Sequence, residues 1–329
     1  MKHLLPPATV LCLVAACSSL HTTYEIPPAM TIETTAYDAA GTSELGQPTE
    51  IKDPALHHVF RLSDDIVSGA EPETEAALEA ISKLGVKTLL SVDGKAPDAA
   101  TAAKYGMRYV HVPIRYKGIS DDEKLAIAKT FRELEGPFYV HCFHGKHRGP
   151  SAAAIGRVVL DGAPREQAIA EMRQWCGTSK KYEGLYTAIA LEQLPSAEET
   201  EAFRFDFPAE HQFVGTRGAM VEISRGWEIV EQLSKRDWRA PDDHPDANAL
   251  NESVKLAEVF AQLRKMDATA SKPADFQGWL ADSERECSEL AELLKRLADG
   301  DASANALAVD KAKQLKASCS ACHTEYRNH

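Results

Sequence analysis

The chain has 329 residues and a formal net charge of −12, from 37 basic and 49 acidic side chains. This length suggests two domains plus a tether. Because the chain is acidic and its charges are scattered without a basic block, we expect no nucleic acid among its partners.

Residues 1–16 have the features of a bacterial signal peptide: a charge at Lys2, a short apolar run and small residues at the end. The apolar run is too short to span a bilayer as a mature helix. The following stretch, LVAAC at 13–17, resembles a lipoprotein lipobox, which implies cleavage before Cys17 and acylation of that residue. Ser18 in place of Asp implies outer-membrane sorting, facing the periplasm. An ordinary signal peptide is the alternative.

Residues 17–52 are rich in Thr, Pro, Glu, Gly and Ser and show no sustained apolar period. Such a composition favours a flexible chain. We therefore expect a lipidated tether that holds the first domain away from the membrane.

Residues 53–193 alternate strand and helix signals, which predicts an α/β domain with a central, mostly parallel sheet. Ser120 and Glu123 form a capping-box pattern at the beginning of one helix. The expected strands cover 58–62, 65–68, 86–92, 108–114 and 138–141, and the expected helices cover 73–84, 96–105, 120–135, 150–160, 165–175 and 181–193.

A strand in this domain runs directly into the sequence HCFHGKHR at 141–148. Backbone N–H groups of such a loop can surround a phosphate, and the helix that follows adds its positive end. That field is expected to lower the pKa of Cys142, while Arg148 binds two phosphate oxygens. Gly145 permits a tight turn. The expected phosphate-binding residues are Phe143, His144, Gly145, Lys146, His147 and Arg148.

The loop matches HCxxGxxR, the signature of the cysteine-dependent protein-tyrosine and dual-specificity phosphatases. The segments FRLSDDIVSGAEP, LGVKTLLSVDG and GMRYVHVPI also resemble the early strands of compact dual-specificity phosphatases. The resemblance covers about 53–193. It implies that Cys142 attacks phosphorus and that Arg148 binds the phosphoryl group of a phosphoprotein, a phospholipid or a small ester. The alternative is a non-catalytic phosphate-binding domain.

Two positions depart from the family pattern. Gly149 stands where the family usually has Ser or Thr directly after the arginine, although Ser151 is near in sequence. The family's general acid is an Asp after the strand that ends in VPI, where this chain has Arg, Tyr and Lys at 115–117. The remaining candidates are Asp121 and Asp122, with Asp93 at the end of another strand. Asp121 and Asp122 also suit a helix's first turn.

Other histidines and cysteines leave several interpretations open. The histidines at 141, 144 and 147 could form a metal site, but support of Cys142 and shaping of the pocket are the preferred roles. Cys176 is a possible redox partner of Cys142, or else a buried thiol. Cys287 is most simply a small apolar residue.

Residues 194–208 are expected to form an interdomain linker. Residues 209–329 contain four helical stretches with apolar stripes and no strand signal, which predicts an antiparallel four-helix bundle.

The last of these stretches contains Cys319, Cys322 and His323 in the pattern CxxCH. Two cysteines at this spacing can form thioethers with haem vinyl groups, and the histidine can ligate the iron. Covalent haem attachment takes place outside the bacterial cytoplasm, in agreement with the export signal. A C-terminal CxxCH in such a bundle resembles the cytochrome c′ family, and this resemblance places Met220 at the distal face of haem c. Met220 as a core residue is the alternative.

The sequence thus predicts a lipid-anchored phosphatase joined to a c-type haem module for electron transfer or for redox or gas sensing, with a redox protein as a possible partner. The alternative is a phosphate-binding domain without turnover attached to an electron-transfer cytochrome.

Overall fold

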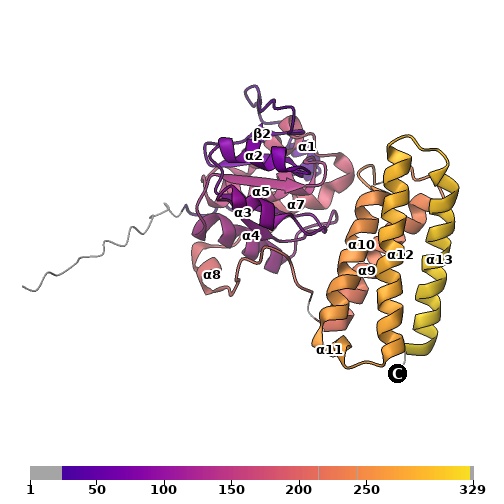
Figure 1. Ribbon diagram of the computed structural model, residues 1–329. Helices are drawn as coiled ribbons and strands as arrows, with labels where there is room; N and C mark the ends of the chain where they lie inside the picture. The colour runs from indigo at the N-terminus through magenta and orange to yellow at the C-terminus, as the bar shows by residue number, and fades with distance from the viewer. Residues whose placement is uncertain (1–23, 214, 243, 327–329) are drawn as a thin grey trace, which may run out of the picture.

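A computed structural model describes residues 24–213, 215–242 and 244–326 (Figure 1). Cys17 and the signal peptide therefore lie outside the described residues. The described chain forms an α/β domain followed by a helical domain. In this part of the chain, no helix is both long and apolar enough to cross a membrane.

The α/β domain contains a six-stranded sheet in the order β1-β2-β3-β6-β4-β5. The last four in this order are parallel neighbours, whereas β1 and β2 run antiparallel at one edge, so the sheet is mixed. The central strand β6 lies between β3 and β4, with Ala70 beside Cys142 and Ser91 beside His141. The strands are β1 Thr49–Glu50, β2 Phe60–Arg61, β3 Ile66–Ala70, β4 Thr88–Ser91, β5 Arg108–His111 and β6 Phe138–Cys142.

Helices cover both faces of this sheet. Successive strand residues point to opposite faces, and the two apolar clusters divide accordingly. Leu89 and Tyr139 pack with α2 Glu75–Lys83 and α3 Ala99–Lys104. Their neighbours Leu90 and Val140 pack in the larger cluster on the other face. The elements of that cluster are α4 Asp121–Glu133, α5 Arg148–Val159, α6 Arg165–Ala170, a π-helical turn Glu171–Trp175, a 3-10 turn Lys180–Tyr182 and α7 Glu183–Ala190.

The described residues of the expected tether are folded onto this domain. The prediction of a flexible tether is therefore wrong from residue 24 onward. The short helix α1, Ala36–Ala39, begins with backbone N–H groups of Ala36 and Tyr37 that donate to Glu183 over 2.6 and 3.2 Å. Ala36 and Ala40 are fully buried in the larger cluster. Apolar side chains in an irregular segment can still pack against the surface of a folded domain. A search for periodicity does not detect such packing.

The expected linker at 194–208 is also part of the α/β domain. It forms α8, Ala197–Ala202, with a capping box between Ser196 and Glu199. Arg132 of α4 donates to the carbonyls of Pro195 (3.0 Å) and Ser196 (2.8 Å). The aromatic side chains at 203, 205 and 207 pack on the larger cluster. These contacts explain why the segment does not behave as a free linker.

The described residues of the helical domain form four long helices and one short helix. Neighbouring helices pack in a closed circuit, α9 with α10, α10 with α12, α12 with α13 and α13 with α9, around one apolar cluster. The bounds are α9 Gly215–Ser234, α10 Ala249–Lys265, α11 Asp267–Ala270, α12 Ala274–Ala298 and α13 Ala304–Tyr326.

Candidate active site

The candidate loop follows the central strand and precedes α5. Cys142 is the last residue of β6, and α5 begins at Arg148. Gly145 in the loop has φ +71°, and a Cβ there would lie 2.4 Å from the backbone nitrogen of Ala70 in β3. Both the backbone conformation and the close approach of β3 therefore require glycine at 145.

Backbone N–H groups of the loop form an anion-binding cradle. The N–H of Phe143 donates to an Asp93 carboxylate oxygen over 3.2 Å. Within the described residues, the N–H groups of 144–147 have no protein acceptor. They stand at the N-terminus of α5, where free N–H groups and the helix dipole favour an anion. The loop can therefore accept the oxygens of a phosphate group.

Arg148 is buried beside this cradle. Its guanidinium forms an ion pair with Asp93 and lies 4.3 Å from the centre of the Tyr116 ring. Burial alone would raise the pKa of Asp93, but the Arg148 charge and the N–H of Lys95 hold that pKa well below its usual range. Asp93 is thus a charged group that fixes Arg148 at the loop.

The Cys142 thiol is fully buried, and its pKa is higher than usual, contrary to the expectation from the loop motif. Burial is the largest cause, and the carboxylates of Asp246 and Asp93 add to it. Arg148 and the N–H of Gly149 act in the opposite direction without overcoming these effects. The groups that lower the pKa of Cys142 belong to the motif, whereas the two carboxylates that raise it come from elsewhere in the chain.

Asp246 is a site residue that the sequence did not reveal. It lies between α9 and α10 of the helical domain, yet its carboxylate hydrogen-bonds to Tyr116 and His144 and lies 3.4 Å from Nδ1 of His147. Its backbone N–H donates to the Tyr182 hydroxyl over 3.2 Å. An Asp in a connection between helices carries no local signal, so only the tertiary structure could identify it.

Asp121 and Asp122, the first candidates for the general acid, are not brought to the loop. Both are exposed in the first turn of α4, where Asp121 pairs with Lys124 at 2.9 Å. The alternative given above, that these acidic residues are favoured by the dipole of the helix, fits this position. Asp93, the third candidate, is the one that contacts the loop.

The region after Arg148 contains no hydroxyl placed to replace the family's Ser or Thr. Ser151 donates to the Arg148 carbonyl over 2.9 Å. A Cβ at Gly149 would lie 3.1 Å from the Cys142 nitrogen, which is tight but tolerable with a small shift. Glycine therefore brings α5 close to the end of β6.

The three loop histidines have different surroundings. His141 is buried with Nε2 2.9 Å from the Tyr109 hydroxyl, and burial lowers its pKa to about 3, so it is neutral at ordinary pH. His144 and His147 face Asp246. Among the described residues, no group of three or more His, Cys, Asp or Glu side chains has a geometry suited to a metal ion.

Cys176, the possible redox partner, is a buried free thiol in the same apolar cluster as Cys142. Burial raises its pKa, with the Cys142 sulfur and Glu171 adding to the effect. Its carbonyl is 2.7 Å from Nε2 of His58. The structure shows two separate thiols and leaves their redox pairing a hypothesis.

A second candidate site is a cavity of about 750 Å³ in the helical domain. Cys319, Cys322 and His323 of α13 line it together with Met220 and Trp227 of α9. The lining is mostly apolar, and Phe260 of α10 and Phe276 of α12 complete it. The residues present therefore fit a large flat apolar group attached at α13. Cys287 is buried nearby in the same cluster, and burial raises its pKa.

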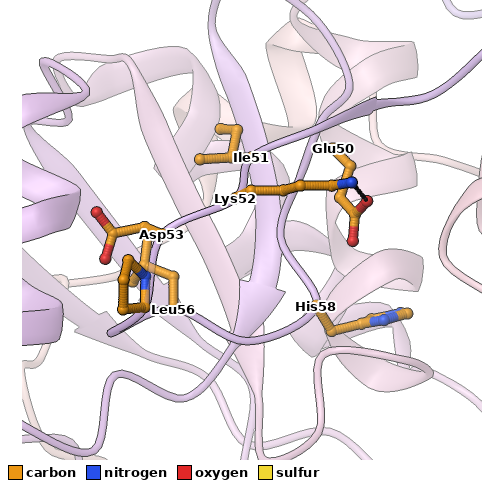
Figure 2. Close-up of a pocket in the computed structure, with 7 residues that line it drawn as sticks. Glu50, Ile51, Lys52, Asp53, Leu56 and His58 are labelled. Carbon is orange, nitrogen blue, oxygen red and sulfur yellow. Dashed lines mark ion pairs between the residues drawn. The ribbon is translucent and has the colours of Figure 1, made fainter.

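A third, shallow hollow lies at the β1 edge of the sheet. Glu50 and Lys52 border it and form an ion pair of 3.5 Å, and Figure 2 shows His58 on the same side as Glu50, with Asp53 and Leu56 opposite. Its volume is about 440 Å³, and the side chain of Lys52 is largely exposed while that of Glu50 is about half exposed. None of the loop residues 142–148 lines it, so it is separate from the candidate active site.

Fold and loop together define an α/β domain with a Cys-x5-Arg loop after a central parallel strand. No family model matches the chain. It is similar to the dual specificity protein phosphatase TpbA of Pseudomonas aeruginosa, with 30% identity over 124 residues in strain UCBPP-PA14 and 29% over 123 residues in strain PAO1. These alignments cover 37% of this chain, which spans about half the length of the curated relatives it matches (56% and 55%).

Solved structures of TpbA are also similar to this chain. The crystal structure of P. aeruginosa TpbA has 26% identity and a TM-score of 0.37, and the similarity covers 43% of this chain and 88% of that one. A cysteine-to-serine variant of TpbA in complex with phosphotyrosine has 25% identity and a TM-score of 0.37, covering 43% and 86%.

Proposed function

We propose that the α/β domain is a cysteine-dependent phosphatase that hydrolyses phosphate monoesters. The observation that carries this proposal is the loop itself, in which unpaired backbone N–H groups, Arg148 and the Cys142 thiol converge after β6. The sequence similarity to dual specificity phosphatases supports the same reaction class.

The loop residues have distinct roles in this reaction. The Cys142 thiolate attacks phosphorus, so that an S–P bond forms while the P–O bond to the leaving group breaks. Arg148 and the loop N–H groups stabilise the charge on the three transferred oxygens. The leaving oxygen takes its proton from solvent, and water then cleaves the S–P bond, which regenerates the Cys142 thiolate and releases inorganic phosphate. The pKa of Asp93 is too low for this carboxylate to donate a proton to the leaving group at neutral pH. Its role is therefore to position Arg148 through their ion pair.

An aryl phosphate is the substrate to test first, because the Tyr116 ring lies against Arg148 and Phe143 is an aromatic residue of the loop itself. Wild-type protein in reducing buffer should release the aryl alcohol, and Cys142→Ser should abolish release. Cys176→Ser is the matched control and should retain turnover. Equal rates for wild type and Cys142→Ser would contradict the proposal.

A second candidate function is phosphate binding without turnover. It is favoured by the raised pKa of Cys142 and by the absence of a hydroxyl at 149. In this case wild type and Cys142→Ser should bind orthovanadate or tungstate with similar affinity, and neither should hydrolyse any phosphate ester in a broad panel.

We further propose that the helical domain holds haem c. The cavity that brings Cys319, Cys322, His323 and Met220 together supports this proposal. The two cysteines would form the thioether bonds, His323 would ligate the iron and Met220 would face it from α9. The bound group supplies one-electron redox chemistry or gas binding, and the apolar lining of the cavity limits access of water.

Covalent attachment is tested by denaturing gels stained for haem peroxidase activity. Wild type should retain the stain after acid–acetone extraction, whereas the Cys319→Ser, Cys322→Ser double variant should lose it. Cys287→Ser, a matched change in the same domain, should keep it. Complete extraction from the wild type would overturn the assignment.

The export and lipid signals at the N-terminus extend the proposal to a cell-envelope protein, lipid-anchored through Cys17 and facing the periplasm, where a redox protein could exchange electrons with the haem. Cys17→Ser should move the protein from the membrane fraction to the soluble fraction. Retention of that variant in membranes would contradict the anchor.

A further inference from the structure

The helical domain lies against the loop side of the α/β domain. Figure 1 shows α10 on the side of the helical domain that faces the α/β domain. The residues in front of α10 and its first turns reach the loop. The groups above the buried Cys142 therefore include side chains from both domains.

Asp246 of the helical domain contacts the phosphate loop directly. Both oxygens of its carboxylate are engaged, one by His144 and the other by the Tyr116 hydroxyl, and His147 approaches the second oxygen. Two of these partners belong to the phosphate loop, and the Tyr116 ring lies against Arg148. The carboxylate is 4% exposed. An anion of the helical domain is thus enclosed next to the cradle that accepts phosphate.

Contacts outside the loop also hold the helical domain against the α/β domain. Asn251 of α10 donates to Asp93 over 3.4 Å, and Asp93 is the carboxylate that fixes Arg148. Further along α10, Glu258 accepts the N–H of Ala96 over 2.8 Å. Arg115 pairs with Glu222 of α9 at 3.3 Å. The interface therefore extends across one whole side of the site.

We propose that the helical domain is an autoinhibitory lid, in which the Asp246 carboxylate occupies the mouth of the phosphate loop, so that a phosphate ester binds only after the two domains part. Inhibition of hydrolysis rests on the proposed phosphatase function. The covering of the loop by the helical domain depends only on the contacts between the two domains. The occupant that must displace Asp246 is a phosphoryl dianion, which would meet a fixed like charge at close range.

Closure has a simple quantitative consequence. If only a small fraction of molecules is open, the apparent affinity for substrate and the apparent reactivity of Cys142 are both reduced by that fraction. Weakening the interface should raise both until the open form dominates. A change on the order of tenfold corresponds to a loss of about 1.4 kcal/mol from the closed state.

Two variants weaken the interface by different means. Asp246→Ala removes the carboxylate from the loop. Asn251→Asp is isosteric, suits the first turn of a helix and places a second carboxylate against Asp93. The matched controls are Asp242→Ala, an exposed aspartate four residues before Asp246, and Asn305→Asp, which retains the oxygen that accepts from Trp238.

The primary readout is the rate at which iodoacetamide alkylates Cys142 in the full chain, followed by mass spectrometry of the Cys142 peptide in the absence of substrate. Both interface variants should react on the order of tenfold faster than wild type, and both controls should match wild type. Asn251→Asp is decisive, because an added negative charge cannot lower the pKa of Cys142, so a faster rate reports exposure.

Hydrolysis of an aryl phosphate by the same proteins is the second readout. Faster alkylation with faster hydrolysis supports the lid. Faster alkylation without any hydrolysis supports closure and contradicts the phosphatase function alone. Unchanged alkylation in both variants overturns the lid. A lower kcat of Asp246→Ala with unchanged alkylation would also overturn it and would assign to Asp246 a direct role in proton transfer.

Discussion

Two glycines with positive φ show how much of the site depends on single residues. Gly145 and Gly85 have similar backbone conformations, with φ of +71° and +85°. A Cβ at 85 would meet nothing within 4 Å, whereas a Cβ at 145 would overlap the backbone of β3. The two positions therefore separate the cost of backbone conformation from the cost of steric overlap.

We expect Gly85→Ala to destabilise the α/β domain by about 1 kcal/mol, the cost of a left-handed residue with a side chain. Gly145→Ala should cost about 3 kcal/mol or more and disturb the loop, because the neighbouring backbone must also move. Urea unfolding of the two variants, monitored by near-UV circular dichroism, measures the difference. Equal losses would show that β3 yields easily at this point.

Asp93 illustrates a residue whose two effects oppose each other. It fixes Arg148, and it also raises the pKa of Cys142. We expect Asp93→Asn to shift the pH profile of Cys142 alkylation to lower pH, because one nearby negative charge is lost. The KM for an aryl phosphate should rise several-fold, because Arg148 loses its partner. Asp64→Asn, an exposed position, should change neither quantity.

At the scale of elements, Glu183 of α7 secures the beginning of α1, while Arg173 and Gln174 hold the residues that follow it. Glu183 accepts the first two N–H groups of α1. Its removal leaves those groups without an acceptor at a half-buried site, at a cost of about 1–3 kcal/mol. We expect Glu183→Ala to loosen the beginning of α1 and to make the chain around residues 34–38 more susceptible to protease, while the bonds from Arg173 and Gln174 still hold the residues that follow.

Limited proteolysis with mapping of the cleavage sites tests this expectation. Glu198→Ala, an exposed acidic residue in α8, is the control and should resist cleavage like the wild type. Cleavage of the wild type at the same positions and rate as Glu183→Ala would mean that Glu183 does not secure the segment.

The elements that the sequence predicted are those with a sustained apolar pattern. Strand β4, helix α4 with Ser120 and Glu123, and the four long helices lie where their patterns indicated. The elements it missed, β1, α1 and α8, are short and are secured by distant partners such as Glu183 and Arg132. The same distinction holds at the site. The loop was readable as a motif, whereas Asp246 reaches it only through the packing of two domains.

At the scale of the whole molecule, α10 contacts both candidate sites. Asn251 near its beginning touches Asp93, and Phe260 further along lines the cavity of the helical domain. Gly226 of α9 packs closely on Leu256 between these two points. A change in the cavity that displaces α10 would therefore also act on the interface at the phosphate loop, which gives the two domains a physical route of communication.

Glu258 of α10 makes this interface sensitive to pH. Burial raises its pKa to about 7, and Glu210 and Glu71 add to the shift against the lowering effects of the Ala96 N–H and Lys95. When the domains part, Glu258 returns to its ordinary value near 4.5. Its protonated form therefore favours the closed state. The contribution is fully present below about pH 4.5 and is lost as the pH rises through about 7. Asp93 and Asp246 have depressed pKa values and stay charged across this window.

We therefore expect opening to increase more steeply between about pH 5 and pH 8 in the wild type than in Glu258→Gln, which keeps a neutral acceptor for Ala96 at every pH. Burial also raises the pKa of Glu252 and of Glu71, and both carboxyls are retained in the variant. The measurement is the ratio of Cys142 alkylation rates, wild type over Glu258→Gln, because the titration of the thiol itself cancels in the ratio. The ratio should be close to one at the acidic end and rise several-fold above pH 7. Glu222→Gln, an interface carboxylate whose partner Arg115 is exposed, serves as the matched variant for the loss of one interface charge. A flat ratio for Glu258→Gln would show that Glu258 stays charged in the closed form, and that the interface tolerates this charge.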